Sequence, residues 1–498
     1  MIIRTFMLAA VLAAPAMAAP ALDTPVKDQW WADGRAALDA RLKAVNRPRR
    51  AKNVILLVGD GMGVSTITAA RIFDGQRPID GRAPASGEEN SLAWDRMAHT
   101  ALVKTYNSNA QVPDSAGTAS AFNTGVKTRI GVLNFGADQG VEACKTPEKL
   151  PRTLAEMARA NGMGLGIVTT TRITHATPAA VYGHAPNRNW EGADRAYPAA
   201  DRASGCPDLA TQLVRFKGGF DVVLGGGGAK FLPAGKGGTR DDGRNLVDEW
   251  QKMQPDGRFV ADARGLRALN TTDTAPVLGL FNADHISYEV DRKDEAEPGL
   301  PEMARFALAR LQAGAKQRGG KGYYLMIEGG RIDHAHHASN PYRALKEAQM
   351  FSATVAEVLK RVNLDDTLVL VTADHSHVLT IAGYPQRGND ILGYIKPPAS
   401  GGESDGALSK EGWALDDRGQ PMTTLGYANG PFLSRGLSRL LPPNDPNYLA
   451  MKTHGTDSES HGGEDVALFA EGPRADLVRG VMEQNLIFHI MVEALGWR

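Results

Sequence analysis

Acidic and imidazole side chains follow several apolar runs of this chain, at positions where they could bind metal ions. Asp60 comes after NVILLVG, Glu328 after GYYLMI, and Asp374 with His375 after TLVLVTA. Ligands of open parallel sheets bind outside the carboxyl ends of the strands, because loops and helix N-termini meet there. His461 instead precedes its apolar run, in SHGGEDVALFA. Together these groups predict one metal-binding site at a sheet edge.

The spacing of Asp333 and His337 favours zinc. Residues four apart share one face of a helix, and a carboxylate with an imidazole is a ligand pair that suits Zn²⁺. The run DHAHH that contains them is rich in histidine, and a surface histidine cluster is the alternative interpretation. For Asp374 and His375 the alternative is an Asx turn with an incidental histidine.

Ser115 lies in PDSAGTASA, a run of small residues that leads into a predicted helix. A serine at such a position is commonly a helix cap, whereas a nucleophilic serine needs an activating group. Because no GxSxG elbow surrounds Ser115, a Ser-His-Asp triad has little support. A metal ion would activate the hydroxyl instead, assisted by the positive end of the helix dipole.

Composition and charge exclude several classes of protein. The chain has 498 residues, of which 42% are hydrophobic, and 55 glycines, which excludes a disordered or collagen-like chain. Its 56 basic and 56 acidic residues cancel, so no overall basic field attracts nucleic acid or anionic lipid. After the N-terminus, no apolar run is long enough to span a membrane. Selectivity must therefore come from a local site.

Residues 1–18 have the features of a secretory signal peptide. Arg4 supplies an early positive charge, a short apolar run follows, and Ala16 and Ala18 form an A-x-A pattern. A membrane anchor is the alternative, but Pro15 interrupts the run. We therefore expect cleavage near Ala18 and export, either to the periplasm or by full secretion.

Export makes the two cysteines, Cys144 and Cys206, candidates for a disulfide. An oxidising compartment favours a bridge between them, and the alternative is a pair of buried free thiols.

Apolar runs alternate with helical periods along the chain, which predicts an α/β fold with a mostly parallel central sheet and helices on both faces. Predicted strands are 53–58, 164–169, 221–224, 322–327, 367–371 and 465–469, and predicted helices are 151–161, 301–313, 341–362 and 476–495. We expect residues 19–50 to form an N-terminal helical arm, and residues 51–383 and 460–498 to form the α/β core. The Gly- and Pro-rich segment 384–459 is typical of an inserted subdomain.

Seven motifs resemble those of the alkaline phosphatase family, in the family's order, from about residue 52 to the C-terminus. They are GDGMG at 59–63, PDSAGTASA at 113–121, HATPAA at 175–180, NRNW at 187–190, EGGRIDHAHH at 328–337, TADHSH at 372–377 and HGGEDVALFA at 461–470. The resemblance implies a homodimeric α/β metalloenzyme that hydrolyses small phosphate monoesters through a phosphoserine. It implies two zinc ions and one magnesium ion per subunit, and the segment 384–459 resembles the insertion that forms a crown over the dimer.

The same motifs imply a role for each matching residue. Ser115 would be the nucleophile, and Arg188 would clamp two phosphate oxygens. The implied ligands are Asp333, His337 and His461 for one zinc ion, Asp60, Asp374 and His375 for the other, and Asp60, Thr177 and Glu328 for magnesium. Oxygen ligands suit magnesium and mixed nitrogen and oxygen ligands suit zinc, which agrees with this division. His175, His334 and His377 are implied to orient ligands or bound water.

Several positions relate the chain to one branch of the family. His175 and His334 match the animal-type enzymes, which have histidine at both positions, and the spacing of Cys144 and Cys206 resembles a disulfide of that branch. Asn282, which follows a GLF motif, differs, because the animal-type enzymes carry a glutamate there for a fourth metal site. The resemblance therefore leaves the presence of a fourth metal site open.

Two other functions are compatible with the same metal-binding framework. One is a phosphodiesterase or sulfatase of the wider superfamily, but the CxPSR or SxPSR setting of sulfatases is absent, and diesterases often have Thr where this chain has Ser115. The other is a non-catalytic exported protein that binds phosphate or metal. Such a protein would need neither Ser115 nor Arg188.

Overall fold

A computed structural model describes residues 29–42, 50–399, 407–431 and 441–497 of the chain. The expected signal peptide and parts of the expected arm and insertion lie outside these residues. Within the expected arm, Gln29–Leu42 forms helix α1. Among the described residues, no helix has the length and apolar character needed to cross a membrane.

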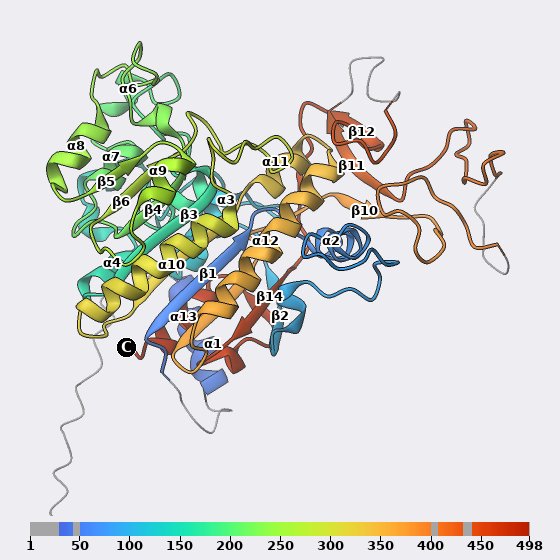
Figure 1. The fold of residues 1–498 in the computed structure, drawn as a ribbon. Coiled ribbons are helices and arrows are strands. Elements are labelled where there is room, and N and C mark those ends of the chain that lie inside the picture. Colours follow the sequence, from blue (N-terminus) through green and yellow to red (C-terminus); the bar gives the residue numbers. More distant parts are fainter. Residues whose placement is uncertain (1–28, 43–49, 400–406, 432–440, 498) are drawn as a thin grey trace, which may run out of the picture.

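A ten-stranded sheet forms the centre of the molecule (Figure 1). In spatial order its strands are β15 (Gly480–Glu483), β2 (His99–Lys104), β14 (Val466–Glu471), β8 (Thr367–Thr372), β1 (Asn53–Gly59), β7 (Tyr323–Gly329), β3 (Gly164–Arg172), β4 (Val222–Gly226), β6 (Val277–Leu280) and β5 (Arg258–Val260). Strand β14 runs antiparallel to β2 and β8, whereas the other neighbouring strands are parallel. The prediction of a mostly parallel central sheet is confirmed.

The central strands are buried on both faces because helices cover both sides of the sheet. Every residue of β7 and β8 is buried, as is β1 after its first residue. On one face, α10 (Leu300–Gln317) packs on β3, β4 and β7, and α12 (Pro341–Arg361) packs on β1, β7 and α2 (Val64–Gln76). On the other face lie α3 (Ser115–Thr124), α4 (Leu154–Ala160) and α13 (Leu486–Ala494). This double cover explains why the strand sequences are apolar runs rather than alternating patterns.

Shorter elements complete the described fold. The helices are α5 (Ala176–Ala179), α6 (Ala199–Arg202), α7 (Leu209–Val214), α8 (Leu246–Met253), α9 (Ala263–Ala268) and α11 (Arg331–His337). A three-stranded sheet contains β10 (Leu379–Ile381), β11 (Leu425–Pro431) and β12 (Lys452–Thr456), and β11 and β12 lie to one side of the large sheet (Figure 1). A two-stranded sheet pairs β9 (Ser376–His377) with β13 (His461–Gly462).

The helix predicted over 476–495 is wrong in its first half. Gly480 has a φ of +66°, in the left-handed region that interrupts a helix. The next residues form β15, which pairs in parallel with β2, and α13 begins only at Leu486. Strand β2 itself is half-exposed and was not predicted, so the partner that turns this segment into a strand could not be inferred from local periodicity.

A disulfide joins Cys144 to Cys206, with their Cα atoms 5.1 Å apart. Cys206 packs with Trp190 and Tyr197, whose rings stack at 4.2 Å. Because Trp190 belongs to the NRNW motif, the bridge fixes the segment that also carries Arg188. The expectation of a bridge rather than two free thiols is confirmed.

Removing this bridge should destabilise the fold. In the chain-entropy model, a cross-link between residues separated by 62 positions lowers the stability of the unfolded chain by about 4 kcal/mol. We expect the variant Cys144→Ser with Cys206→Ser to lose stability of this order in chemical denaturation. Dithiothreitol should produce the same loss in the wild type and no further loss in the variant, and an unchanged denaturation midpoint would contradict the role of the bridge.

Candidate active site

The metal-ligating residues expected from the sequence gather at the edge where the parallel strands end. Asp60 directly follows β1, Glu328 lies near the end of β7, and Asp374 follows β8. His461 precedes β14, and because β14 runs antiparallel to β8, its amino end lies at this same edge. The antiparallel direction of β14 explains why His461 precedes its strand, whereas the three carboxylates lie at or after the ends of theirs. Pairing of β9 with β13 then places His461 opposite His377.

Ser115 is the first residue of α3, and it is buried. The Asp114 side chain caps the helix by accepting a hydrogen bond from the Gly117 backbone N–H, at 3.1 Å. Asn107 donates to the same carboxylate, and a Cβ on Gly117 would lie about 2.5 Å from the Asn107 side chain. The small residues of α3 thus let this cap assemble in the interior. The Oγ of Ser115 lies 3.1 Å from Nε2 of His375, at the positive end of the helix dipole.

Three histidines present Nε2 to the centre of the cluster, because their Nδ1 atoms face backbone carbonyls. The Nδ1···O distances are 3.2 Å for His375 and Ser376, 2.8 Å for His461 and Pro113, and 2.5 Å for His337 and Glu459. A carbonyl only accepts hydrogen bonds, so each Nδ1 carries the proton and each Nε2 keeps its lone pair. The Nε2 atoms of His337 and His461 are only 3.1 Å apart. Facing lone pairs at this distance are the arrangement that a shared cation stabilises.

Four buried carboxylates surround these imidazoles: Asp60, Glu328, Asp333 and Asp374. Among the described residues, neither Oδ of Asp60 has a hydrogen-bond partner, nor do Glu328 Oε1 and Asp374 Oδ2. Burial, with the neighbouring carboxylates of Asp374 and Asp333, raises the pKa of Asp60 well above its usual range. Burial also raises the pKa of Glu328 to about 7, although two threonine hydroxyls donate to it. Such crowding disfavours ionised carboxylates unless a cation is present.

The ligand atoms form overlapping groups, each suited to an ion. Those of Asp60, Asp374 and His375 lie within 4.8 Å of one another. In another group, Nε2 of His337 and Nε2 of His461 lie 3.4 Å and 3.5 Å from Oδ1 of Asp333. These groups bring together the residues expected to hold the two zinc ions.

The group expected to hold magnesium includes a histidine. Ligand atoms of Asp60, Glu328 and His175 lie within 4.8 Å of one another, although His175 was expected only to orient other ligands. Thr177 lies on α5, and its Oγ1 is buried without a hydrogen-bond partner among the described residues. The hydroxyls of Thr169 and Thr171, which sequence reasoning missed, donate to Glu328. They lie at the end of β3, next to β7, so a complete strand assignment could have found them.

Arg188 is held in place by two partners beside Ser115. Its Nη1 donates to Oδ2 of Asp114 at 2.9 Å, and its Nη2 lies 3.1 Å from Nε2 of His175. Burial raises the pKa of Asp114, but the Arg188 guanidinium and backbone N–H groups outweigh burial and keep the pKa below its usual value. The ionised cap of α3 therefore also orients the guanidinium, which is suited to bidentate binding of oxyanions.

Glu459 is a buried carboxylate that sequence reasoning missed. Its Oε2 lies 2.5 Å from Nδ1 of His377, and its Oε1 accepts the Val378 backbone N–H at 2.8 Å. Nε2 of His377 in turn lies 2.7 Å from Oδ1 of Asp333. Burial lowers the pKa of His377, but the two carboxylates raise it to about 10. The protonated ring therefore links Glu459 to Asp333, and the position of Glu459 two residues before His461 was the available signal.

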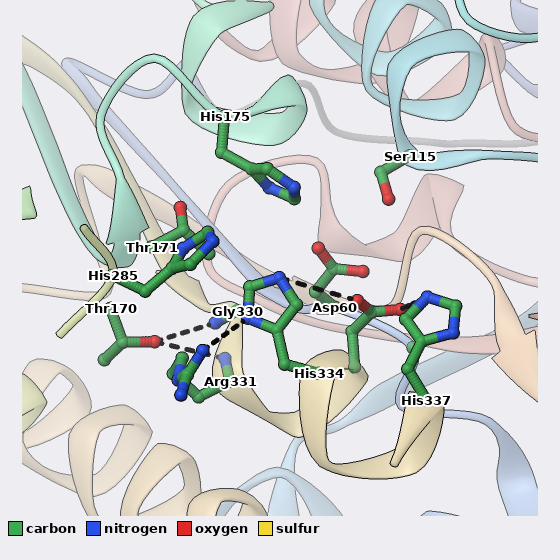
Figure 2. A network of polar contacts seen from close by, with 12 residues as sticks. Asp60, Ser115, Thr170, Thr171, His175, His285, Gly330, Arg331, His334 and His337 are labelled. Atoms are coloured by element: carbon green, nitrogen blue, oxygen red, sulfur yellow. Dashed lines mark hydrogen bonds and ion pairs between the residues drawn. The ribbon is translucent and has the colours of Figure 1, made fainter. Parts of the chain in front are cut away.

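Three further imidazole rings lie together on one side of Asp60 (Figure 2). The ring centroids of His285 and His334 are 4.2 Å apart, and each is 5.4 Å from that of His175. Burial lowers the pKa of His334 to about 3 and holds those of His175 and His285 well below the usual range, so the rings are neutral at pH 7. His285 was missed because it follows β6, a strand that was not predicted.

Thr170 and Arg331 position α11, the helix that carries Asp333 and His337. The Thr170 hydroxyl accepts the backbone N–H groups of Gly330 and Arg331, at 3.0 and 3.2 Å (Figure 2). The Arg331 guanidinium donates to Nδ1 of His334 at 2.9 Å. The end of β3 thereby fixes the start of a helix with Asp333 and His337 on one face, as their spacing predicted.

Comparison with known proteins assigns this site to a family. The model of the family described as alkaline phosphatase matches residues 51–497. The chain belongs to the alkaline phosphatase family. It is 41% identical to the tissue-nonspecific alkaline phosphatase of Gallus gallus over 474 residues, covering 91% of this chain and 86% of that protein. It is 38% identical to an alkaline phosphatase of Gadus morhua, covering 93% and 95% of the two chains.

A solved structure agrees with this assignment. The alkaline phosphatase of Thermus thermophilus is 27% identical, with a TM-score of 0.64 and coverage of 91% of this chain and 93% of that one. The resemblance inferred from the motifs is therefore confirmed. This alkaline phosphatase hydrolyses phosphate monoesters, and its buried acidic and imidazole groups could hold metal ions.

Weakening the Glu459 contact should loosen the cluster without removing any group that faces its centre. In Glu459→Gln, the charge that holds the protonated His377 is lost, while the backbone carbonyl that orients His337 remains. Loss of a group that orients a metal ligand typically costs about 10- to 100-fold in metal affinity or activity. We expect metal affinity to fall by a factor in this range, measured by titrating the bound metal with a chelator.

Asp457→Asn is the matched control, because Asp457 is an exposed carboxylate in the same segment. It should leave metal retention unchanged. Equal metal retention by Glu459→Gln and the wild type would show that Glu459 has no positioning role.

Proposed function

We propose that this alkaline phosphatase acts through a covalent phosphoserine at Ser115, with two zinc ions and one magnesium ion per chain, as an exported homodimer. The observation that carries the proposal is the position of the Ser115 hydroxyl. It lies at the N-terminus of α3, 3.1 Å from Nε2 of His375 and next to the buried acidic cluster. A serine that served only as a helix cap would not need to face this cluster.

Unsatisfied buried atoms support the presence of metal ions. Asp60, Asp374, Glu328 and Thr177 each have a buried oxygen without a hydrogen-bond partner among the described residues, and such atoms are costly unless something coordinates them. We assign Asp333, His337 and His461 to one zinc ion, Asp60, Asp374 and His375 to the other, and Asp60, Thr177 and Glu328 to magnesium. The geometry also makes His175 a candidate ligand of the third ion.

When bound, zinc supplies positive charge that lowers the pKa of an adjacent hydroxyl and offsets negative charge on reacting oxygens. The Ser115 hydroxyl loses its proton, and its Oγ attacks phosphorus. The ester P–O bond breaks, the departing oxygen leaves on the opposite side and takes up one proton, which balances the proton that Ser115 released, and a phosphoserine forms. A water molecule then attacks the same phosphorus from the vacated side, which releases inorganic phosphate and returns a proton to the serine oxygen.

The chain's own charges hold the phosphoryl group during both steps. Arg188 presents its guanidinium to two phosphoryl oxygens, which matches the fork geometry of this group. Asp114 keeps Arg188 aligned, at 2.9 Å, and also caps the helix that begins with Ser115. One carboxylate therefore sets the position of both the nucleophile and the clamp, so attack occurs in line with the departing oxygen.

Export and dimerisation complete the proposal. A disulfide between Cys144 and Cys206 is typical of an oxidising compartment outside the cytosol, and the signal-like residues 1–18 point to the same route. For the homodimer, support comes from the family resemblance. Exposed Ile381, Tyr384 and Leu408 supply apolar surface in or beside the segment expected to form the crown.

Replacing Ser115 by Ala should abolish the covalent intermediate. In the wild type, acid quenching after incubation with radiolabelled phosphate should trap label on the protein. The variant has no oxygen to carry the phosphoryl group, so it should trap none and lose at least a thousandfold in kcat. Ser108→Ala is the control, because the Ser108 hydroxyl has no hydrogen-bond partner among the described residues. Label retained on Ser115→Ala would contradict the proposed nucleophile.

Replacing His461 by Ala should remove one zinc ion per chain. Loss of a group that only orients a metal ligand typically lowers metal affinity or activity about 10- to 100-fold. Loss of the ligand itself should therefore lower metal affinity by about a hundredfold or more. Elemental analysis of the purified variant measures the metal content directly. His454→Ala, which alters an exposed imidazole on β12, should keep the full content. Unchanged zinc in His461→Ala would refute the ligand assignment, whatever the activity.

A further inference from the structure

A cavity of about 660 Å³ lies between α4 and α7, away from the acidic cluster. Its walls also include Tyr182 and His184, which follow α5, and the residues from Phe216 to Gly218. Helix α4 leads into the amino end of β3, and the Phe216–Gly218 segment leads into the amino end of β4. The cavity therefore faces a different part of the sheet from the active site, which lies at the carboxyl ends. Its volume is within the range of small-molecule sites, about 300 to 1,000 Å³.

Hydrogen bonds hold the cavity walls in place. Gln212 on α7 accepts the His184 backbone N–H and donates to the His184 carbonyl, both at 2.8 Å. Arg159 at the end of α4 donates to the Gly219 carbonyl at 2.8 Å and to Asp221 at 2.7 Å. These bonds connect the helix and loop segments around the cavity. The cavity is thus preformed, which reduces the entropic cost of binding a ligand.

Aromatic side chains line one part of the cavity. Tyr182 and Phe216 both contribute to the wall, and Phe220 joins them, with ring centroids 6.2 Å from Tyr182 and 4.7 Å from Phe216. The Tyr182 hydroxyl already donates to the Ile173 carbonyl. Tyr182 is only 3% exposed, so it backs the wall, and the half-buried Phe216 supplies the apolar surface that a ligand meets. A ligand with an aromatic or aliphatic body would bury its surface here.

The charged side chains of the cavity are mostly cationic. Arg152, Arg159, Arg215 and Lys217 line it, against one acid, Glu156. The Glu156 carboxylate accepts the Thr153 backbone N–H at the start of α4, and Asp221 neutralises Arg159. Positive charge therefore remains in excess at this place, on a chain whose overall charge is zero.

Two of these cations are available to a ligand. Arg215 and Lys217 are exposed at the rim, and among the residues that the structure describes neither side chain has a hydrogen bond or an ion pair. A guanidinium and an ammonium beside an apolar wall recognise an anion attached to an apolar body. A neutral ligand would leave both cations unused, and an inorganic anion would leave the aromatic wall unused.

We propose that this cavity is a binding site for an organic anion that carries a carboxylate, sulfonate or phosphate group on an aromatic or aliphatic body. The acidic group contacts Arg215 and Lys217, and the body lies against Phe216, which packs in front of Tyr182. The site shares no lining residue with the acidic cluster. Occupancy therefore does not depend on metal ions or on the phosphoserine.

Calorimetric titration with naphthalene-2-sulfonate tests the proposal on the full-length, metal-loaded enzyme. Excess inorganic phosphate is present throughout, so that the active site is occupied. We expect saturable binding at one site per chain. Methanesulfonate, which has the charge without the aromatic body, should bind at least about tenfold more weakly because it leaves the aromatic wall unused.

Charge reversal at the rim provides the matched variants. Arg215→Glu with Lys217→Glu should weaken naphthalene-2-sulfonate binding about tenfold or more, because two attractive contacts become repulsive. Lys236→Glu with Lys252→Glu changes the net charge equally at exposed positions outside the cavity and should not alter binding. Both variants should hydrolyse p-nitrophenyl phosphate at the wild-type rate, which verifies that they fold.

Several outcomes would overturn the proposal. Absence of saturable binding to the wild type would do so, as would equal affinity in the two double variants. Equal affinities for methanesulfonate and naphthalene-2-sulfonate would exclude a role for the aromatic wall. Competition between phosphate and the probe would place the probe in the active site instead.

Discussion

Asp60, Glu328, Asp333 and Asp374 bring four carboxylates into one buried region, and the histidines His337, His375 and His461 face it with lone pairs rather than protons. Negative charge and lone pairs at such distances repel one another in a medium of low dielectric constant. The arrangement is stable only if cations join it, or if carboxylates take up protons, as the raised pKa values of Asp60 and Glu328 indicate. The remaining architecture can be understood as the means of holding this unfavourable arrangement in place.

Five adjacent strands hold these acidic and imidazole groups in position. In the order β14, β8, β1, β7 and β3, they lie at the middle of the sheet, where helices cover both faces and burial of apolar side chains is greatest. A strand at the edge of the sheet would lack the packing needed to offset buried charge. The antiparallel direction of β14 also matters, because it brings His461 to the edge where the parallel strands end without a further crossover connection.

Polar groups behind the cluster fix the direction of each side chain. Backbone carbonyls orient the three imidazoles, Glu459 and Asp333 hold His377 between them, and Asp114 aligns Arg188. Glu459 and His461 are reached only after the chain has left the large sheet and formed β10, β11 and β12 (Figure 1). His461 then begins β13, which pairs with β9. The long segment after His377 is therefore part of the active site's construction rather than an addition to it.

The sequence by itself determined the local features of this protein. Apolar runs predicted β1, β7 and β8 because a doubly covered strand needs apolar residues on both faces, and the four-residue spacing placed Asp333 and His337 on one helix face. Motif order was enough to recognise the family. The tertiary structure alone decided which distant groups meet: Glu459 with His377, His285 with His334, Asp114 with Arg188, and the strand β15 where periodicity predicted a helix. Each of these depends on a partner far along the chain, and local periodicity holds no information about such partners because their contact exists only once the sheet has formed.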